Sequence, residues 1–460
     1  MKFTLLSINF FILLFFNACA PKQAMIKVDM LVGDGSYKSA AQFSDSKIDT
    51  NNLYAKNNLL WSLQSGGAYF YADENNSSIK YFDDSELIMK YYREQILSKD
   101  ISQTIISTLL NDTTRPYIGT QYDGVMANTY KALSYMALQD KNAARVEFNR
   151  AIDRQRRAKI FFSEMINKER LSIEKKEQES KSEGKNLQVD KSLRDSLISQ
   201  KYPLLHNYKP YPDFINPMTT YLAGLFAKTD GAKSKADSLL QEAYGMMPEN
   251  ENVKKELEED IREDTVWLIF ENGQAPVLKE WRIDFPIWIF TSRLSYISVA
   301  LPKLVLRNKA YDYLLITDDT NTTTQTKFLS SMDRVIQTEF EKNYDATLRR
   351  AILSTATKAA INYTIQKQAN NNSSGIAAFV SIASTIYQIA STQADTRSWT
   401  TLPKEFQLAR FKRPKNGNIK IRASNNLLIK NIKIPDTQHT LIYVKIARPN
   451  AQASVKVIPF

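Results

Sequence analysis

The sequence predicts an α+β protein, with an α-helical N-terminal half and a C-terminal half of mixed strands and helices. Two observations carry this prediction. Small and aromatic residues recur at helical spacing in three stretches between residues 60 and 250. From about residue 263 the pattern changes to short runs in which apolar and β-branched residues alternate with polar ones, as in strands. A chain of 460 residues is long enough for two or three packed cores.

The N-terminus has the pattern of a secretory signal peptide, residues 1–18. Lys2 supplies a positive charge, residues 3–16 are almost wholly apolar, and Ala18 precedes Cys19, the only cysteine in the chain. The apolar run is too short to cross a hydrocarbon core of about 30 Å comfortably. A small residue followed by Cys resembles a bacterial lipobox, which implies cleavage before Cys19 and its acylation, with palmitate among the expected chains. An uncleaved anchor, or a plain signal peptide with an incidental cysteine, is the alternative.

The residue after Cys19 indicates which of the two bacterial membranes holds the lipid anchor. In the sorting rule of Gram-negative bacteria an Asp at this position favours the inner membrane, so Ala20 implies a lipid anchor in the outer membrane, facing the periplasm. Residues 19–58 are polar, with little periodicity, and are interpreted as a lipid-anchored tether. No cysteine remains beyond residue 19, so packed cores must provide the stability of the mature protein.

The charge is basic and dispersed. The net charge is +12 over the full sequence, and the Lys and Arg residues are spread along the chain instead of forming one arm. A lipid-anchored envelope protein meets no nucleic acid, so the available polyanions are anionic lipid headgroups and cell-wall carboxylates. A solvated basic surface is the simpler interpretation.

Three stretches within residues 59–262 predict helical hairpins that resemble tetratricopeptide (TPR) repeats. Small and bulky residues recur together at steps of 3, 9, 4 and 3. The small ones mark where two helices would cross, and the bulky ones would fill the gaps between the helices. A plain helical bundle is the alternative. The positions that define the hairpins are Gly66 and Tyr69; Ala132, Tyr135, Ala144, Phe148 and Ala151; and Gly224, Ala236, Leu240, Ala243 and Pro248.

The hairpins are not tandem. Residues 168–200 are rich in both basic and acidic side chains and poor in apolar ones, which predicts a solvated or disordered helical insertion. The next residues, 201–217, contain four prolines, which favour an extended segment leading into the third hairpin.

Residues 263–460 predict a separate α+β region with a mainly antiparallel sheet and two helices. The stretch 264–289 is interpreted as a β-hairpin that breaks at Asn272-Gly273, and further strands are expected near 295–306 and 310–317. Helices are expected over 330–369 and 375–391; the second is apolar but more typical of a buried helix than of a membrane span. Four strands follow from residue 405, with turns at Gly417 and Pro435.

The sequence offers little for catalysis. Its two histidines, His206 and His439, fall in loops, and the mature chain has no cysteine for a Cys/His zinc site. No phosphate-binding loop, dinucleotide fingerprint, nucleophile elbow or HExxH motif is present. We therefore expect no enzyme activity, no cofactor and no metal. A pair of remote carboxylates acting as a glycosidase remains an alternative that sequence cannot test.

Four short motifs resemble those of a poorly characterised family of Gram-negative lipoproteins. They are RPY-x-G at 115–119, ENGQAP at 271–276, ALP at 300–302 and DTRSWTTLP at 395–403, in the same order. The resemblance implies a TPR-like N-terminal half, and an acid after the first motif, here Asp123 where Glu is usual. It assigns no activity or ligand. The matching positions are Arg115, Pro116, Tyr117 and Gly119; Asn272, Gly273 and Pro276; and Arg397, Trp399 and Pro403.

These features predict a non-enzymatic outer-membrane lipoprotein that acts as a periplasmic interaction scaffold or assembly factor. Stacked helical hairpins would leave a concave groove for a segment of another envelope protein. A cell-wall-linked regulator or binder of peptidoglycan synthesis is the second interpretation, and an envelope hydrolase is the third.

Overall fold

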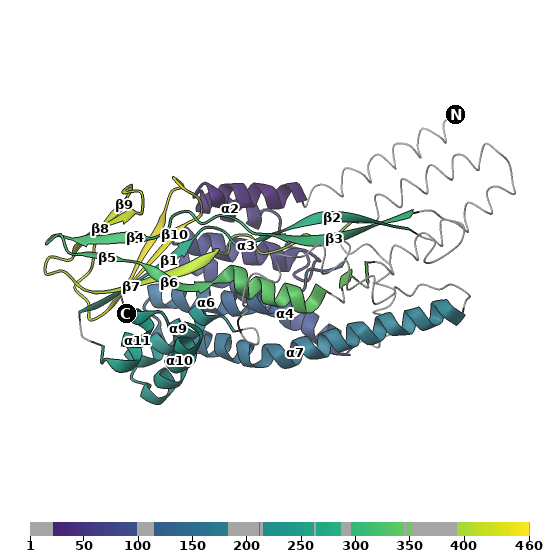
Figure 1. Cartoon of the computed structure of the whole chain (residues 1–460), viewed down its shortest axis with the longest axis horizontal. Helices are drawn as coiled ribbons and strands as arrows, with labels where there is room; N and C mark the ends of the chain where they lie inside the picture. Colours follow the sequence, from purple (N-terminus) through teal and green to yellow (C-terminus); the bar gives the residue numbers. More distant parts are fainter. Residues whose placement is uncertain are drawn as a thin grey trace.

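The computed structural model describes residues 22–98, 115–182, 211, 215–261, 264–286, 296–344, 347–348, 350–351 and 393–459. Its helices are residues 22–33, α2 (Tyr37–Asp45), α3 (Asn58–Tyr71), α4 (Asn75–Ser98), α6 (Gln121–Ala137), α7 (Lys141–Ser182), α9 (Pro217–Thr229), α10 (Lys233–Met246), α11 (Glu251–Glu258) and residues 332–344. Its strands are β1 (Thr265–Asn272), β2 (Val277–Pro286), β3 (Tyr296–Val305), β4 (Leu314–Asp318), β5 (Thr323–Gln325), β6 (Lys327–Ser331), β7 (Glu405–Lys412), β8 (Asn418–Ala423), β9 (Leu428–Lys433), β10 (Thr440–Ile446) and β11 (Ser454–Pro459). A helical half precedes a mainly antiparallel strand half, so the predicted α+β class is confirmed (Figure 1).

Three helix pairs, α3–α4, α6–α7 and α9–α10, form the helical half, as the spacing predicted. The small residues lie at the helix crossings. A Cβ atom on Gly66 would lie 2.8 Å from the Phe82 ring, and one on Gly224 would lie 2.9 Å from the Leu240 side chain. The other positions are buried, except that Tyr135 is half-buried and Pro248 exposed: Tyr69, Ala132, Ala144, Phe148, Ala151, Ala236 and Ala243.

The strands form two stacked sheets and a separate ribbon. The order in the five-stranded sheet is β11-β10-β1-β7-β6, and in the four-stranded sheet it is β5-β4-β8-β9. In the central strand β1, Trp267 and Ile269 pack into the core shared with the helices, whereas Leu268 and Phe270 pack against the second sheet. Alternation along one strand therefore produces three layers: helices, the five-stranded sheet and the four-stranded sheet.

The predicted β-hairpin between β1 and β2 is wrong, although both strands exist. β1 pairs in parallel with β10 and antiparallel with β7, while β2 pairs only with β3. The intervening loop sends its N–H groups elsewhere: Gly273 donates to Ile446 O and Ala275 to Leu402 O. Gly273 has a φ of 70°, which turns the chain out of the sheet. The ribbon β2–β3 extends away from the two sheets and runs along the helical part of the molecule (Figure 1).

The two halves are not separate in structure, contrary to the prediction. One buried core contains residues from the hairpins and from β1, β7, β10 and β11. Every residue of α3 is buried, and a Cβ atom on Gly67 would lie 3.2 Å from Trp399 and 2.9 Å from Thr401 Oγ1. The chain's own segment around residues 398–402, together with the sheet, therefore fills the place where the open groove was expected.

The predicted tether is also wrong in its described part. Residues 22–33 and α2 are helices, and α2 packs on α3. Val28 and Val32, one helical turn apart, are fully buried, with Met25 and Leu31 packed beside them. The apolar stripe is narrow, and the surrounding lysines, aspartates and glycines conceal it in the sequence.

Other predictions fall partly outside the described residues. The charged insertion begins as a continuation of α7, which runs to Ser182, and residues 183–200 are not described. The expected helix 330–369 is observed over 332–344, and the expected helix 375–391 lies outside the described residues, as does the signal peptide. Within the part of the chain that the structure describes, no helix is both long and apolar enough to cross a membrane.

Candidate functional site

The RPY-x-G motif forms the entrance to helix α6. Gly119 has a φ of 77°, which suits glycine, and Thr120 and Asp123 form a reciprocal capping box. Tyr117 OH donates to Asp123 Oδ2 at 2.7 Å. Burial raises the pKa of Asp123 to about 6, against the hydrogen bonds from Thr120 and Tyr117 that favour its charged form. The acid after the motif is therefore part of the helix cap.

A second carboxylate binds the same helix N-terminus from the C-terminal half. Glu339, on the helix 332–344, accepts hydrogen bonds from the backbone N–H groups of Gln121 at 2.9 and 3.0 Å and of Tyr122 at 3.4 Å. Burial raises the pKa of Glu339 to about 8, although these N–H groups favour the charged form. Through these hydrogen bonds Glu339 joins the two halves of the chain at the start of α6.

The RPY-x-G and DTRSW motifs meet in space. The Arg397 guanidinium lies 5.8 Å from the centre of the Tyr117 ring, and it donates to Asp395 and to Asn57 Oδ1 at 2.8 Å. Trp399 is buried against Phe82 and Tyr130. Of the remaining motif positions, Arg115 is half-buried, Pro116 exposed and Pro403 buried.

The ENGQAP motif is a joint between the sheet and three other segments. Asn272 Nδ2 donates to Tyr311 O at 2.6 Å, and its Oδ1 accepts from Ala310 N at 2.8 Å. A Cβ atom on Gly273 would lie 2.9 Å from Asn308 O, so only glycine fits. Pro276, buried like Gly273, ends the loop immediately before β2. The motif residues that the resemblance singled out therefore hold the fold together.

A buried group of ionisable side chains lies under this joint. Glu271 and Lys445 are fully buried, with Lys445 Nζ 3.8 Å from Glu271 Oε2 and 2.9 Å from Gly273 O. Tyr130 OH donates to Glu271 Oε1 at 2.7 Å, and Tyr443 OH donates to the same oxygen. Burial lowers the pKa of Lys445 to about 8, against the attraction of Glu271.

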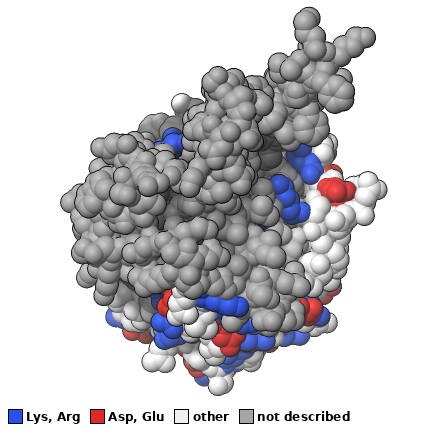
Figure 2. Space-filling view, turned by 90° about the vertical axis from the view of Figure 1, so that its right-hand side faces the viewer, with Lys and Arg blue, Asp and Glu red and all other residues white. Residues whose placement is uncertain are grey.

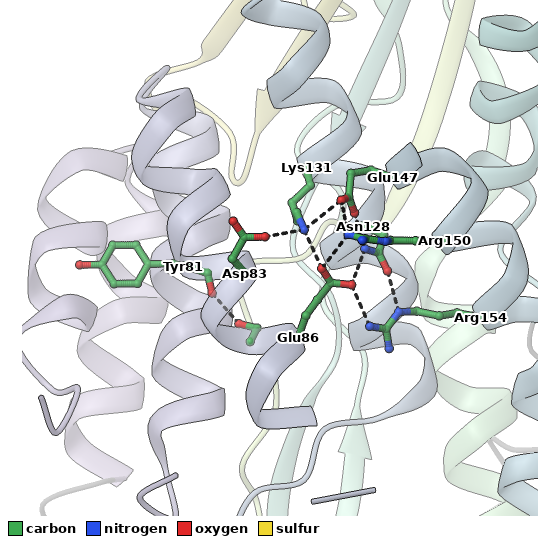
Figure 3. A network of polar contacts seen from close by, with 9 residues as sticks. Tyr81, Asp83, Glu86, Asn128, Lys131, Glu147, Arg150 and Arg154 are labelled. Atoms are coloured by element: carbon green, nitrogen blue, oxygen red, sulfur yellow. Dashed lines mark hydrogen bonds and ion pairs between the residues drawn. The ribbon is translucent and has the colours of Figure 1, made fainter. Parts of the chain in front are cut away.

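A second charged group lies among the helices (Figure 3). Lys131 Nζ, buried on α6, lies 2.6 Å from Glu86, 2.7 Å from Asp83 and 3.1 Å from Glu147. Burial opposes its charge, but these carboxylates outweigh it and raise the pKa of Lys131. Burial likewise disfavours the charged form of Glu86, yet Lys131, Asn128 and Arg154 lower its pKa to about 2. This network joins α4, α6 and α7.

One surface pocket adjoins the RPY-x-G motif. It is a small pocket, partly open to solvent, between α4, α7 and the start of α6. Arg93 lies over the Phe161 ring at 4.4 Å, with Arg154 near by; Arg154 pairs with Glu86, but no ion pair of Arg93 occurs among the described residues. Burial and the neighbouring Arg154 and Arg157 lower the pKa of Arg93. The lining residues are Met89, Arg93, Ile96, Ile118, Gly119, Thr120, Gln121, Arg154 and Phe161.

Sequence reasoning assigned no role to Glu271, Lys445 or Glu339, although Glu271 is the first residue of the ENGQAP motif. Strand alternation could have found the first two, because Glu271 shares its face with Trp267 and Ile269, and Lys445 falls within a strongly apolar strand. Nothing in the sequence pairs Glu339 with a helix that begins 218 residues earlier.

Cys19 and His206 lie outside the described residues. The His439 ring lies 5.7 Å from that of Trp267, just before β10. Within the described ranges, no three His, Cys, Asp or Glu side chains are grouped so as to hold a metal ion. Comparisons with family models, with curated proteins and with solved structures find no match for this chain. The family resemblance therefore stays a prediction.

Proposed function

We propose that the protein is an outer-membrane lipoprotein, anchored through Cys19, that acts without catalysis as an interaction scaffold in the periplasm. The anchor is supported by the apolar run that ends directly before the only cysteine. The scaffold role is supported by the positions of the buried charged groups. In the described structure, these groups join helices and sheets to one another.

The observation that carries the proposal is the pocket beside RPY-x-G. Its walls combine apolar side chains (Met89, Ile118 and Phe161) with the Arg93 guanidinium, for which the described residues provide no carboxylate. Such a surface suits a partner segment in which an acidic residue stands next to an apolar one, because charge and apolar area are then matched together. The pocket replaces the concave groove as the proposed partner site.

The anchor is tested by the fate of residue 19. Mass spectrometry of the purified mature protein should show an acylated N-terminal Cys19, and Cys19→Ala should release the protein from the membrane or mislocalise it. A mature N-terminus further down the chain, or an unmodified Cys19, would refute the lipoprotein assignment.

The partner site is tested in the intact cell envelope. A photo-crosslinking amino acid at Ile96, in the pocket, should yield a discrete adduct that mass spectrometry identifies, whereas the same probe at Val146, exposed on α7, should not. Arg93→Gln should abolish the adduct, and Lys90→Gln, exposed on the same helix, should leave it intact. Equal crosslinking from both positions would exclude this pocket as the site.

Salt separates this proposal from the cell-wall interpretation. On the face shown in Figure 2, the visible Lys and Arg side chains are interspersed with Asp and Glu, without one large patch of a single sign among the described atoms. Binding to wall polymer through diffuse charge should weaken steeply between low and physiological salt. Capture in a partly apolar pocket should change much less.

A further inference from the structure

The helix 22–33, which begins three residues after Cys19, has an unusual outer face. Its inner face packs through Val28 and Val32, but Ile26 is 52% exposed and Met30 54% exposed. These two side chains are one helical turn apart and therefore lie on the same side of the helix. Figure 1 shows this helix, the darkest purple one, at the outer edge of the body.

A pair of lysines lies beside this apolar row. Lys27 Nζ is 4.4 Å, and Lys47 Nζ 4.8 Å, from the centre of the same ring, that of Phe43. Among the described residues neither ammonium group has an ion pair, so two positive charges share one aromatic ring without a carboxylate. An anion beside Phe43 would be attracted by both charges.

The helix is also fixed rigidly to the body. Asp29 accepts from Gln274 Nε2 at 3.3 Å, pairs with Arg307, and has Arg448 at 3.5 Å, so both sides of the ENGQAP joint hold it. The three residue-to-residue steps from Cys19 to Lys22 span at most about 11 Å. An acylated Cys19 would therefore hold this helix within headgroup distance of the bilayer.

We infer that the outer face of helix 22–33, with Phe43 and Lys47, is a docking surface for an anionic phospholipid membrane. Ile26 and Met30 enter the boundary between headgroups and acyl chains, and Lys27 and Lys47 attract the headgroup phosphates beside Phe43. This inference rests on the proposed anchoring at Cys19. The contact fixes the orientation of the whole protein on the membrane, because Val28, Val32 and Asp29 attach the helix to the body.

The test uses the acylated mature protein in vesicles. Acylated Cys19 leaves no free thiol, so Ile26→Cys or Met30→Cys can be labelled uniquely with a polarity-sensitive dye, with Leu427→Cys on the four-stranded sheet side as control. In phosphatidylglycerol-containing vesicles, nitroxide lipids should quench the dye at 26 and 30 several-fold more than at 427. Lys27→Gln with Lys47→Gln should reduce that quenching towards the value in pure phosphatidylcholine, whereas Lys415→Gln with Lys430→Gln should not.

Several results would overturn the inference. Dyes at 26 and 30 that stay as open to aqueous iodide as the dye at 427 would show that this face is in water. Dyes shielded from both iodide and nitroxide lipid would show that a protein covers the face. Two dyes per chain would instead reveal an unacylated Cys19, a failure of the anchor itself.

The docking face can be judged even without the anchor. A mature chain carrying Cys19→Ser, made without residues 1–18, keeps all the described contacts. It should co-sediment with phosphatidylglycerol vesicles several-fold more than with phosphatidylcholine vesicles, and should lose this preference with the Lys27→Gln, Lys47→Gln pair. Equal co-sedimentation with both vesicles would refute the docking face independently.

Discussion

Two of the lysines that are buried in the described structure, Lys131 and Lys445, lie in different kinds of surroundings. Lys131, among the helices, has three carboxylates within 3.1 Å, and its pKa is raised. Lys445, under the sheet, has one carboxylate at 3.8 Å and a backbone carbonyl, and burial lowers its pKa to about 8. Burial alone therefore does not decide whether a lysine keeps its charge; the number of acceptors that face it does.

The carboxylates near Lys131 and Lys445 also differ in the groups that surround them. Glu86 and Glu147 form ion pairs with Lys131 and with arginines at a half-exposed edge. Glu271, in the buried core, instead accepts hydrogen bonds mainly from neutral tyrosine hydroxyls. The helical half is thus joined by ion pairs, and the joint between helices and sheet by hydrogen bonds from aromatic side chains. The following changes should separate these two modes.

The largest expected effect comes from Lys131→Met. Removing this cation leaves three carboxylates close together, two of them largely buried, which should cost about 3–5 kcal/mol of unfolding free energy. Urea denaturation at pH 7 measures it. Lys90→Met, at an exposed pair on α4, should change stability by less than about 0.5 kcal/mol. Similar losses for both would mean that the Lys131 network contributes no more than a surface pair.

The second effect is a pH dependence from Glu339. Its folded pKa of about 8 exceeds the unfolded value of about 4.3, so the folded state holds the proton that the unfolded state has lost. The stability that Glu339 contributes is therefore highest at low pH and falls as the pH rises from about 4.3 to about 8. The unfolding free energy of Glu339→Gln should not show this fall. As the pH rises, the stability of the variant should therefore increase relative to that of the wild type by at most about 1.4 kcal/mol per pH unit.

Urea denaturation at pH 5.5, 6.5 and 7.5 checks the Glu339 prediction. Asp123, with a pKa of about 6, is present in both proteins, so the comparison concerns the difference between them. Glu258→Gln, at an exposed pair on α11, serves as control and should follow the wild type at every pH. A difference between Glu339→Gln and wild type that does not change with pH would contradict the raised pKa.

The third effect tests packing between the helices. Ala144→Leu and Ala236→Leu should each force a bulky side chain into a helix crossing and cost about 1–3 kcal/mol. Asn142→Ala, on the exposed side of α7, should cost less than about 0.5 kcal/mol. Leu variants that melt like the wild type would show that the crossings tolerate added volume.

The sequence predicted the features that depend on residues close together in the chain, and not those that depend on distant residues. The hairpins could be found because Gly66 and Phe82, or Gly224 and Leu240, are close in sequence and their spacing is set by the helix itself. The pairing of β1 with β10 joins residues more than 170 positions apart, and the local Asn272-Gly273 turn suggested the wrong partner. The candidate motifs were located correctly, but their role as joints depends on partners such as Asp29 and Glu339 that no local pattern indicates.

The smallest effect compares two buried tyrosine hydroxyls. Tyr443 OH donates to Glu271 Oε1, so Tyr443→Phe removes one of two tyrosine donors to a fully buried carboxylate and should cost about 1 kcal/mol. Tyr221 OH, equally buried, has no hydrogen-bond partner among the described residues, so Tyr221→Phe removes an unsatisfied group and should be neutral or stabilising. Urea denaturation of both variants isolates the hydroxyl, because the ring and its packing stay the same. Equal losses would mean that the hydrogen bond from Tyr443 to Glu271 contributes no more to stability than the unpartnered hydroxyl of Tyr221.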